Sequence, residues 1–217
     1  MPEELEGSLI DVIGSAGGKD LLEEAAEFAL DSLVTSDSLK DIPVIGTVAK
    51  LYSIAVDVQG YIFAKKIRRF LIELASVPHE ERKKFIGRIN SDHKYREKTV
   101  DTLTVIIDRL DDLEKAPLLA RALAGHIKEE YDFTTFRRLA SAIDRCLVSD
   151  LWLLEKLDRP KALEGYVGDI LMSAGLASLS AIPVIKYPDT KSTYELSQLG
   201  QLFRQVVFRG LERDDDA

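Results

Sequence analysis

The chain has 217 residues, 46% of them hydrophobic and 30% charged, with a formal net charge of −8 at pH 7. This composition is ample for a folded core of one domain or of a main domain with a small appendage, whereas the negative charge disfavours non-specific DNA binding as the main activity. The single cysteine, Cys146, excludes an intrachain disulfide and a zinc site built from cysteines, and it is typical of a reducing compartment.

The first forty residues are expected to form short amphipathic helices. The start, MPEELEG, is acidic where a secretory signal needs positive charge, so a cytoplasmic location is expected. Lys19–Val34 has apolar residues at helical spacing, and acidic residues occupy much of the remaining surface. This acidic helix could pair with a basic cluster further along the chain, within one molecule or between subunits.

The stretch Ile42–Ala75 is the longest apolar-rich part of the chain and is expected to organise the fold. Between Val44 and Ala64 only Lys50 and Asp57 are charged, so the stretch is long enough to cross a bilayer. A lysine or aspartate near the bilayer centre costs roughly 2.5 to 3.5 kcal/mol on insertion scales. The sequence therefore favours a central helix or helix pair in a soluble bundle over a membrane span.

The apolar stripe of this stretch changes sides partway along. Its first part places Val44, Val48, Leu51, Ala55 and Val58 on one helical face. From residue 63 onward the apolar set, Phe63, Ile67, Phe70, Leu71 and Leu74, is displaced by about half a turn. Either the helix breaks at Gly60, because glycine tolerates non-helical dihedrals, or a continuous helix is covered on opposite faces by different partners.

A basic cluster directly follows the apolar residues. Its members, the candidate partner-facing or membrane-facing residues, are Lys65, Lys66, Arg68 and Arg69. Basic side chains beside an apolar segment can meet anionic lipid headgroups. In this hypothesis Val44–Ala64 leaves the bundle and lies at the membrane surface, so a peripheral membrane location stands beside the cytoplasmic one.

The middle of the chain is a series of expected helices with clear end signals. Pro78 and the acidic residues after it predict the start of a helix that runs to about Asn90. Ser91 and Asp92 are expected to cap the next helix, over residues 94–113, and Pro117 is expected to start or kink another. Short links between such helices favour antiparallel neighbours and hence a bundle over residues 1–158.

A long helix is expected to close this bundle. Asp132 and Thr134 are candidate caps. The inward side chains keep helical spacing from Phe136 to Leu157, where Arg159-Pro160 ends the pattern. Cys146 falls within this helix and is expected to be a small buried apolar group.

Residues 159–217 are expected to form a winged-helix-like module packed on the bundle. Leu163–Ala174 is a predicted short helix, the next residues alternate as in a strand, and Ser192–Leu196 is a possible return strand before a final helix. This order is that of the C-terminal half of a winged helix. The expected fold class is therefore mostly α: a helical bundle with a C-terminal winged-helix-like module that contains a short β-hairpin.

The chemistry of this module argues against DNA reading. A recognition helix normally brings Arg, Lys, Asn or Gln to base edges, whereas Leu163–Ala174 has Glu164 and Asp169 and no basic residue. Lys186 and Lys191 are candidate wing contacts, but two lysines are a weak phosphate-binding set on a protein of this charge. A protein-binding or structural winged helix is favoured over a DNA reader.

Catalytic and metal-binding patterns are not found. The three histidines, at positions 79, 93 and 126, have no metal-ligand spacing; the first two are expected to be exposed at helix starts and the third to lie beside the core. Four carboxylates could share one face between residues 97 and 112, but neighbouring basic residues favour an ion-paired surface. No catalytic residue, metal or cofactor is expected, although active sites assemble in space.

Two phrases of the C-terminal part, LMSAGLASLS and YELSQLGQLF, follow an apolar helical half that contains IPVIG. In this respect the chain resembles uncharacterised bacterial proteins of the abortive-infection alpha type, most clearly over residues 160–210. The resemblance implies a bacterial or mobile-element protein with a role in phage defence. Its motifs are structural and imply no catalytic residue.

The resulting hypothesis is a non-enzymatic interaction or effector protein. Its expected partners are another protein, or further copies of the chain in a homo-oligomer, together with an anionic membrane surface; DNA is disfavoured. The alternative is a winged-helix transcriptional regulator.

Overall fold

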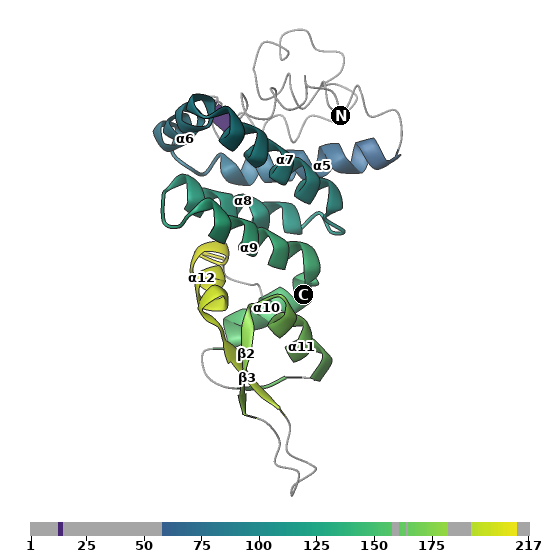
Figure 1. Ribbon diagram of the computed structural model, residues 1–217. Helices are drawn as coiled ribbons and strands as arrows, with labels where there is room; N and C mark the ends of the chain where they lie inside the picture. Colours follow the sequence, from purple (N-terminus) through teal and green to yellow (C-terminus); the bar gives the residue numbers. More distant parts are fainter. Residues whose placement is uncertain (1–12, 15–57, 158–160, 164, 182–191, 212–217) are drawn as a thin grey trace, which may run out of the picture. The chain divides into compact units, whose positions relative to one another are not determined.

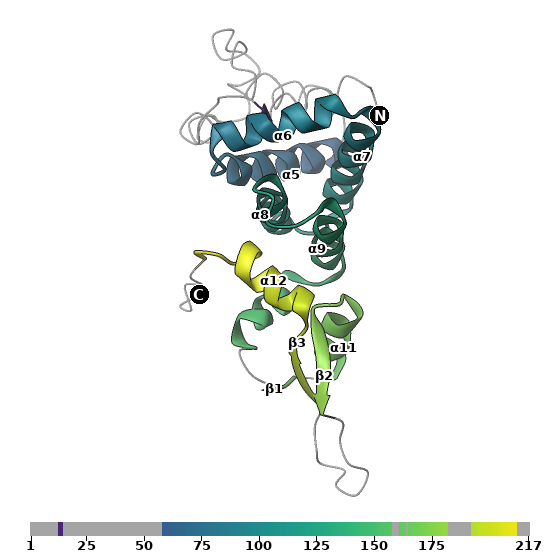
Figure 2. The ribbon, with the colours of Figure 1, turned by 60° about the vertical axis from the view of Figure 1, so that its left-hand side comes forward.

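The structure, a computed structural model, describes residues 13–14, 58–157, 161–163, 165–181 and 192–211. The chain divides into two compact units, residues 1–131 and residues 132–217. The described part is mostly helical and ends in a winged-helix-like module with a short β-hairpin, which confirms the predicted fold class (Figures 1 and 2).

Four helices make up the described part of the first unit. They are α5 (Val58–Leu74), α6 (His79–Ser91), α7 (His93–Arg109) and α8 (Lys115–Ile127). Both α5 and α6 pack against α7 and against α8. Ten of the 13 residues of α8 are buried, because this helix is apolar nearly all round. Among the described helices of this unit, α8 is therefore the most enclosed.

The helix start signals are largely confirmed. Asp92 caps α7 by accepting the backbone N–H of Tyr95 at 3.1 Å, as a side-chain oxygen at a helix start is expected to do. Pro78 lies one residue before α6 rather than in its first position. Pro117 is the third residue of α8, where its missing N–H costs no intrahelical hydrogen bond.

The predicted helix break at Gly60 is wrong. The helix α5 runs through this residue without interruption, because a glycine in the first turn of a helix lowers its stability without requiring a bend. The apolar set from Ile67 to Leu74 is buried as expected, whereas Val58, expected on a buried face, is 73% exposed. Residues 42–57, which include most of the first stripe, lie outside the described residues.

The single long helix expected up to Leu157 is also wrong. It is divided into α9 (Phe133–Arg145), the short α10 (Val148–Trp152) and the 3-10 helix η2 (Leu153–Lys156). Cys146 and Leu147 between α9 and α10 have extended backbone dihedrals, with ψ of 150° at each. They turn the chain, so Leu147 is exposed instead of facing inward, while Cys146 is buried as expected.

The second unit begins at residue 132, so it includes α9 and α10, which the sequence placed with the bundle. Asp132 caps α9 by accepting the N–H of Thr135 at 2.8 Å. The winged-helix-like module then contains β1 (Lys161–Ala162), α11 (Gly165–Ser173), β2 (Ala177–Ala181), β3 (Thr193–Leu196) and α12 (Gln198–Val207). The antiparallel strands lie in the order β1-β3-β2, with β3 in the middle.

The Gly-Leu pair after α11 ends the helix and leads into β2. Gly175 has φ of 78°, in the left-handed region that favours glycine. The N–H of Leu176 donates to Leu171 O and that of Gly175 donates to Met172 O, both at 2.9 Å. This pair of bonds is a Schellman motif, and the Leu176 side chain is fully buried next to it.

Two further glycines allow close packing within the module. A Cβ at Gly168 of α11 would clash with the ring of Tyr194 in β3, and the hydroxyl of Tyr194 donates to Asp169 Oδ1 at 3.0 Å. A Cβ at Gly200 of α12 would clash with the carbonyl oxygen of Leu176. These contacts fix α11 and α12 on the hairpin.

Candidate functional sites

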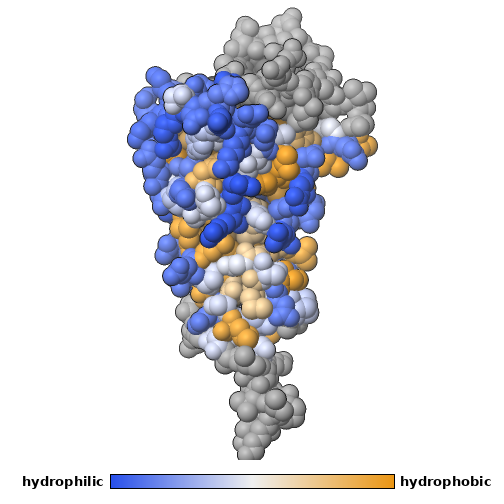
Figure 3. Space-filling view, viewed as in Figure 1, coloured by the Kyte–Doolittle hydropathy of each residue, from blue (hydrophilic) through white to orange (hydrophobic). Residues whose placement is uncertain are grey.

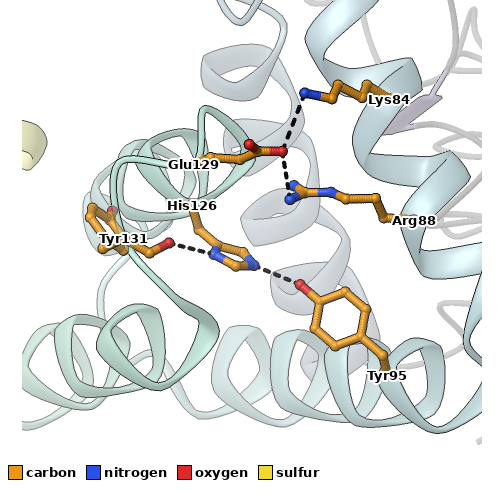
Figure 4. Close-up of polar contacts among 6 residues, drawn as sticks. All are labelled: Lys84, Arg88, Tyr95, His126, Glu129 and Tyr131. Atoms are coloured by element: carbon orange, nitrogen blue, oxygen red, sulfur yellow. Dashed lines mark hydrogen bonds and ion pairs between the residues drawn. The ribbon is translucent and has the colours of Figure 1, made fainter.

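A cluster of polar side chains lies where α6, α7 and the end of α8 meet, and His126 is at its centre (Figure 4). His126 is 6% exposed, and both of its ring nitrogens have partners. Nε2 lies 2.6 Å from the hydroxyl of Tyr95, and Nδ1 lies 3.0 Å from the carbonyl oxygen of Tyr131. Phe85 of α6 meets the imidazole edge-on, with ring centroids 5.8 Å apart.

These partners determine the tautomer of His126. A carbonyl oxygen accepts and never donates, so Nδ1 carries the proton and donates to Tyr131. In the neutral imidazole Nε2 is then the acceptor, and the hydroxyl of Tyr95 donates to it. Burial raises the pKa of Tyr95. The nearby charge of Arg88 and the hydrogen bond with Thr99 lower this pKa, but their effect is smaller than that of burial. Tyr95 is therefore a neutral donor near pH 7.

Glu129 follows α8 in an unusual backbone conformation. Its φ is 60°, and no other described residue except glycine has a positive φ. This conformation costs an L-residue about 1 kcal/mol or more. The N–H of Glu130 donates to Gly125 O at 3.0 Å, which closes the helix. The carboxylate of Glu129 lies 2.8 Å from Arg88 Nη1 and 3.4 Å from Lys84 Nζ, so α6 is joined to this turn.

The chemistry available to this cluster is limited. The lone pair of the His126 imidazole is occupied by Tyr95, and the raised pKa of Tyr95 disfavours a phenolate nucleophile. Within the described ranges, no three His, Cys, Asp or Glu side chains come together as a metal site would require. The arrangement acts as a polar cross-link between α7, α8 and the following turn.

Sequence reasoning placed His126 beside the core, which the structure confirms. It did not find the partners of His126, because Tyr95 is 31 positions away and nothing local marks the pair. His93 is exposed and His79 half-buried, each at the first position of its helix.

The basic cluster of α5 does not form one surface. Lys66 is 6% exposed, and its Nζ donates to the carbonyl oxygen of Asp108 at 2.6 Å. That carbonyl lies in the last turn of α7, where backbone acceptors lack intrahelical donors and favour a cation. Burial lowers the pKa of Lys66, although Asp108 and Asp111 oppose this shift. Lys66 is a helix cap and not a membrane-facing residue.

The other three basic residues of this cluster remain at or near the surface. Arg69 is exposed, and Lys65 and Arg68 are half-buried. The Nζ of Lys65 lies 4.4 Å from the ring centroid of Tyr61, one turn earlier on α5. This is a cation–π geometry. That Lys65, Arg68 and Arg69 face a partner or a membrane stays a prediction.

In the winged-helix-like module, α11 occupies the position of a recognition helix, directly before the first strand of the hairpin. We define the α11 face as its exposed side chains, Tyr166, Asp169, Met172 and Ser173. Tyr166 is 66% and Met172 is 43% exposed. No lysine or arginine occurs in α11. The α11 face is thus apolar and acidic, unlike a surface that contacts phosphates.

The wing residues Lys186 and Lys191 lie outside the described residues.

No protein-family model matches the chain, and the comparisons with curated proteins and with solved structures found no match either. Among the described residues, no helix has the length and apolar character that crossing a bilayer requires.

Proposed function

We propose that this protein is a non-enzymatic interaction protein that binds a protein partner, or another copy of itself, through the α11 face. The observation that supports this proposal is the exposure of Tyr166 and Met172 at the position of a recognition helix. Aromatic side chains and methionine are enriched in protein interfaces, and large exposed aromatics often contribute most of the binding energy.

The same position argues against the alternative, a winged-helix transcriptional regulator. A DNA-reading helix needs hydrogen-bond donors for base edges and positive charge for phosphates. In α11 the exposed polar residues are Asp169 and Ser173, and the carboxylate of Asp169 would repel a phosphate. The module supports protein binding better than DNA binding.

The biological setting belongs to the same proposal. The resemblance to abortive-infection alpha-type proteins supports a bacterial effector with a role in phage defence. The single cysteine, Cys146, is buried, and a chain with one cysteine fits a reducing compartment such as the cytoplasm.

Site-specific photocrosslinking in living bacterial cells tests the proposed interface. A photoreactive phenylalanine analogue replaces Tyr166, and in a control protein it replaces Gln201, which is exposed on α12 of the same module. We expect a discrete crosslinked product from position 166 and none from position 201. We also expect Met172→Glu, combined with the analogue at position 166, to reduce the product by about tenfold or more, because a central apolar contact is lost.

The outcomes separate the hypotheses. Equal crosslinking from both positions, or a product unaffected by Met172→Glu, would show that the α11 face is not a specific interface. Crosslinking of position 166 to DNA instead of protein would support the regulator. The identity of the crosslinked product distinguishes a second copy of the chain from another protein.

A further inference from the structure

A second exposed surface lies on α5. This helix buries Ala64, Ile67, Phe70, Leu71 and Leu74, so its opposite side faces outward. We define the outward face of α5 as Val58, Tyr61, Ile62, Lys65 and Arg69. These positions share one side of the helix, because residues three, four, seven and eleven positions apart are aligned at 3.6 residues per turn.

The first turn of this face is apolar. Val58 is 73%, Ile62 is 41% and Tyr61 is 37% exposed. Figure 3 shows hydrophobic atoms at the surface over the first part of α5, whereas the surface over α6 is mostly hydrophilic. Three large apolar side chains exposed within five consecutive positions form a patch rather than the scattered single residues that most surfaces contain.

The next turns of the same face are basic. The ammonium of Lys65 lies over the Tyr61 ring, 4.4 Å from its centroid, so its positive charge adjoins the apolar patch. Arg69 follows one turn later and is exposed. The single acidic residue of α5, Glu73, pairs with Arg121 of α8 at 2.7 Å. The outward face of α5 therefore carries positive charge that no acid of its own helix neutralises.

We propose that the outward face of α5 docks on an anionic membrane surface. The helix lies parallel to the bilayer, Val58, Tyr61 and Ile62 enter the headgroup region, and Lys65 and Arg69 meet lipid phosphates. Aromatic and basic side chains beside an apolar patch suit this interface, where one end of each side chain is apolar and the other is hydrated. The proposal rests on the proposed function, since it gives the interaction protein a place at which to act.

Docking in this way leaves the bundle intact. Lys66 is not part of the surface, because its ammonium caps α7 at Asp108. The helices α7 and α8 pack against α5. This differs from the sequence-based hypothesis, in which Val44–Ala64 leaves the bundle and all four basic residues face the lipid.

Vesicle flotation of the full chain tests the proposal. The vesicles contain phosphatidylcholine alone or phosphatidylcholine mixed with phosphatidylglycerol. We expect the protein to float with the anionic vesicles and to stay unbound with the neutral ones. Lys65→Gln with Arg69→Gln is expected to weaken binding by about tenfold or more, because each base near an anionic surface contributes to affinity. Val58→Ser with Ile62→Ser is expected to weaken it by a similar factor, because less apolar area enters the bilayer.

The control variant is Lys83→Gln with Lys94→Gln, which removes two exposed lysines of α6 and α7. It loses the same charge from another surface and should bind like wild type. Equal loss in the control, or binding that survives Val58→Ser with Ile62→Ser, would show non-specific attraction and overturn the proposal. Thermal unfolding checks that each variant is folded.

A wild-type protein that stays unbound on anionic vesicles would also overturn the proposal. Crosslinking from position 166 does not depend on α5, so a failure of the membrane proposal is distinguishable from a failure of the proposed function.

Discussion

His126 joins two groups from different segments of the chain, the hydroxyl of Tyr95 and the carbonyl of Tyr131. His126→Phe keeps an aromatic ring of similar size but leaves both groups without the imidazole. We expect it to lower the free energy of unfolding by about 2 kcal/mol, since buried polar groups that lose a partner cost about 1 to 3 kcal/mol. Tyr95→Phe removes one of the two bonds and should cost about 1 kcal/mol.

Urea unfolding followed by circular dichroism measures both variants. A double variant that costs less than the sum of the single variants would confirm that the two side chains act together. If His126→Phe changed the free energy of unfolding by less than about 0.5 kcal/mol, its effect would be that of an ordinary surface substitution. This result would contradict the role of His126 as a polar cross-link.

Lys65 and Lys66 are adjacent in sequence but have different surroundings, and this provides a matched pair of variants. Lys66→Met removes the donor that caps α7 and should lower the free energy of unfolding by about 1 kcal/mol. Lys65→Met acts at a half-buried position and should change it by less than about 0.5 kcal/mol. Equal effects in chemical denaturation would contradict the assignment of Lys66 as a helix cap.

Asp111 and Lys115 give a pH-dependent contribution to stability. Lys115 is 1% exposed and its Nζ lies 2.6 Å from Asp111 Oδ1, a hydrogen bond that lowers the pKa of Asp111. Because the folded-state pKa lies below the unfolded one, the contribution is present above about pH 4 and is lost as pH falls through the lowered value. Asp111 itself is largely exposed, so solvent screening limits the effect to about 1 kcal/mol or less.

Asp111→Asn tests this contribution. We expect the variant to be less stable than wild type at neutral pH, and the difference to shrink as the solution is acidified below about pH 4. Denaturant unfolding across this pH range measures it. A difference that stays constant in acid would show that the carboxylate charge is not responsible.

At the scale of elements, the end signals of helices were predictable and the continuity of helices was not. Asp92 and Asp132 cap their helices because the capping interaction is local and needs a short polar side chain at one position. The division between α9 and α10 kept the apolar spacing almost unchanged, so periodicity alone could not reveal the extended residues Cys146 and Leu147. In α5, a glycine that permits a break did not cause one.

Two glycines in helices should respond oppositely to alanine. At Gly87 of α6 a new Cβ would have nothing within 4 Å, so Gly87→Ala should stabilise the protein by about 0.5 to 1 kcal/mol through helix propensity. At Gly200 of α12 the Cβ would clash with the Leu176 carbonyl, so Gly200→Ala should destabilise it by about 1 to 3 kcal/mol. Thermal unfolding of the two variants measures the contrast, and a stable Gly200→Ala protein would contradict the packing of α12 on the hairpin.

For the whole molecule, the fold class followed from the sequence because helical periodicity and the order of the C-terminal elements are local properties. The candidate sites could be predicted from the sequence only in part. The sequence grouped Lys65, Lys66, Arg68 and Arg69 by adjacency, whereas burial separates Lys66 from the others. The absence of basic residues in α11 was readable from the sequence, but the exposure of Tyr166 and Met172 depends on which side of α11 packs on the module.

The central contrast is whether the winged-helix-like module binds protein or reads DNA. The most direct measurement is selection of bound duplexes from a pool of random DNA sequences by the full chain at physiological salt. The apolar and acidic α11 face predicts weak, salt-sensitive binding with no enriched sequence. Enrichment of a defined sequence, with binding that is lost when Tyr166 or Ser173 is replaced by alanine, would contradict this account.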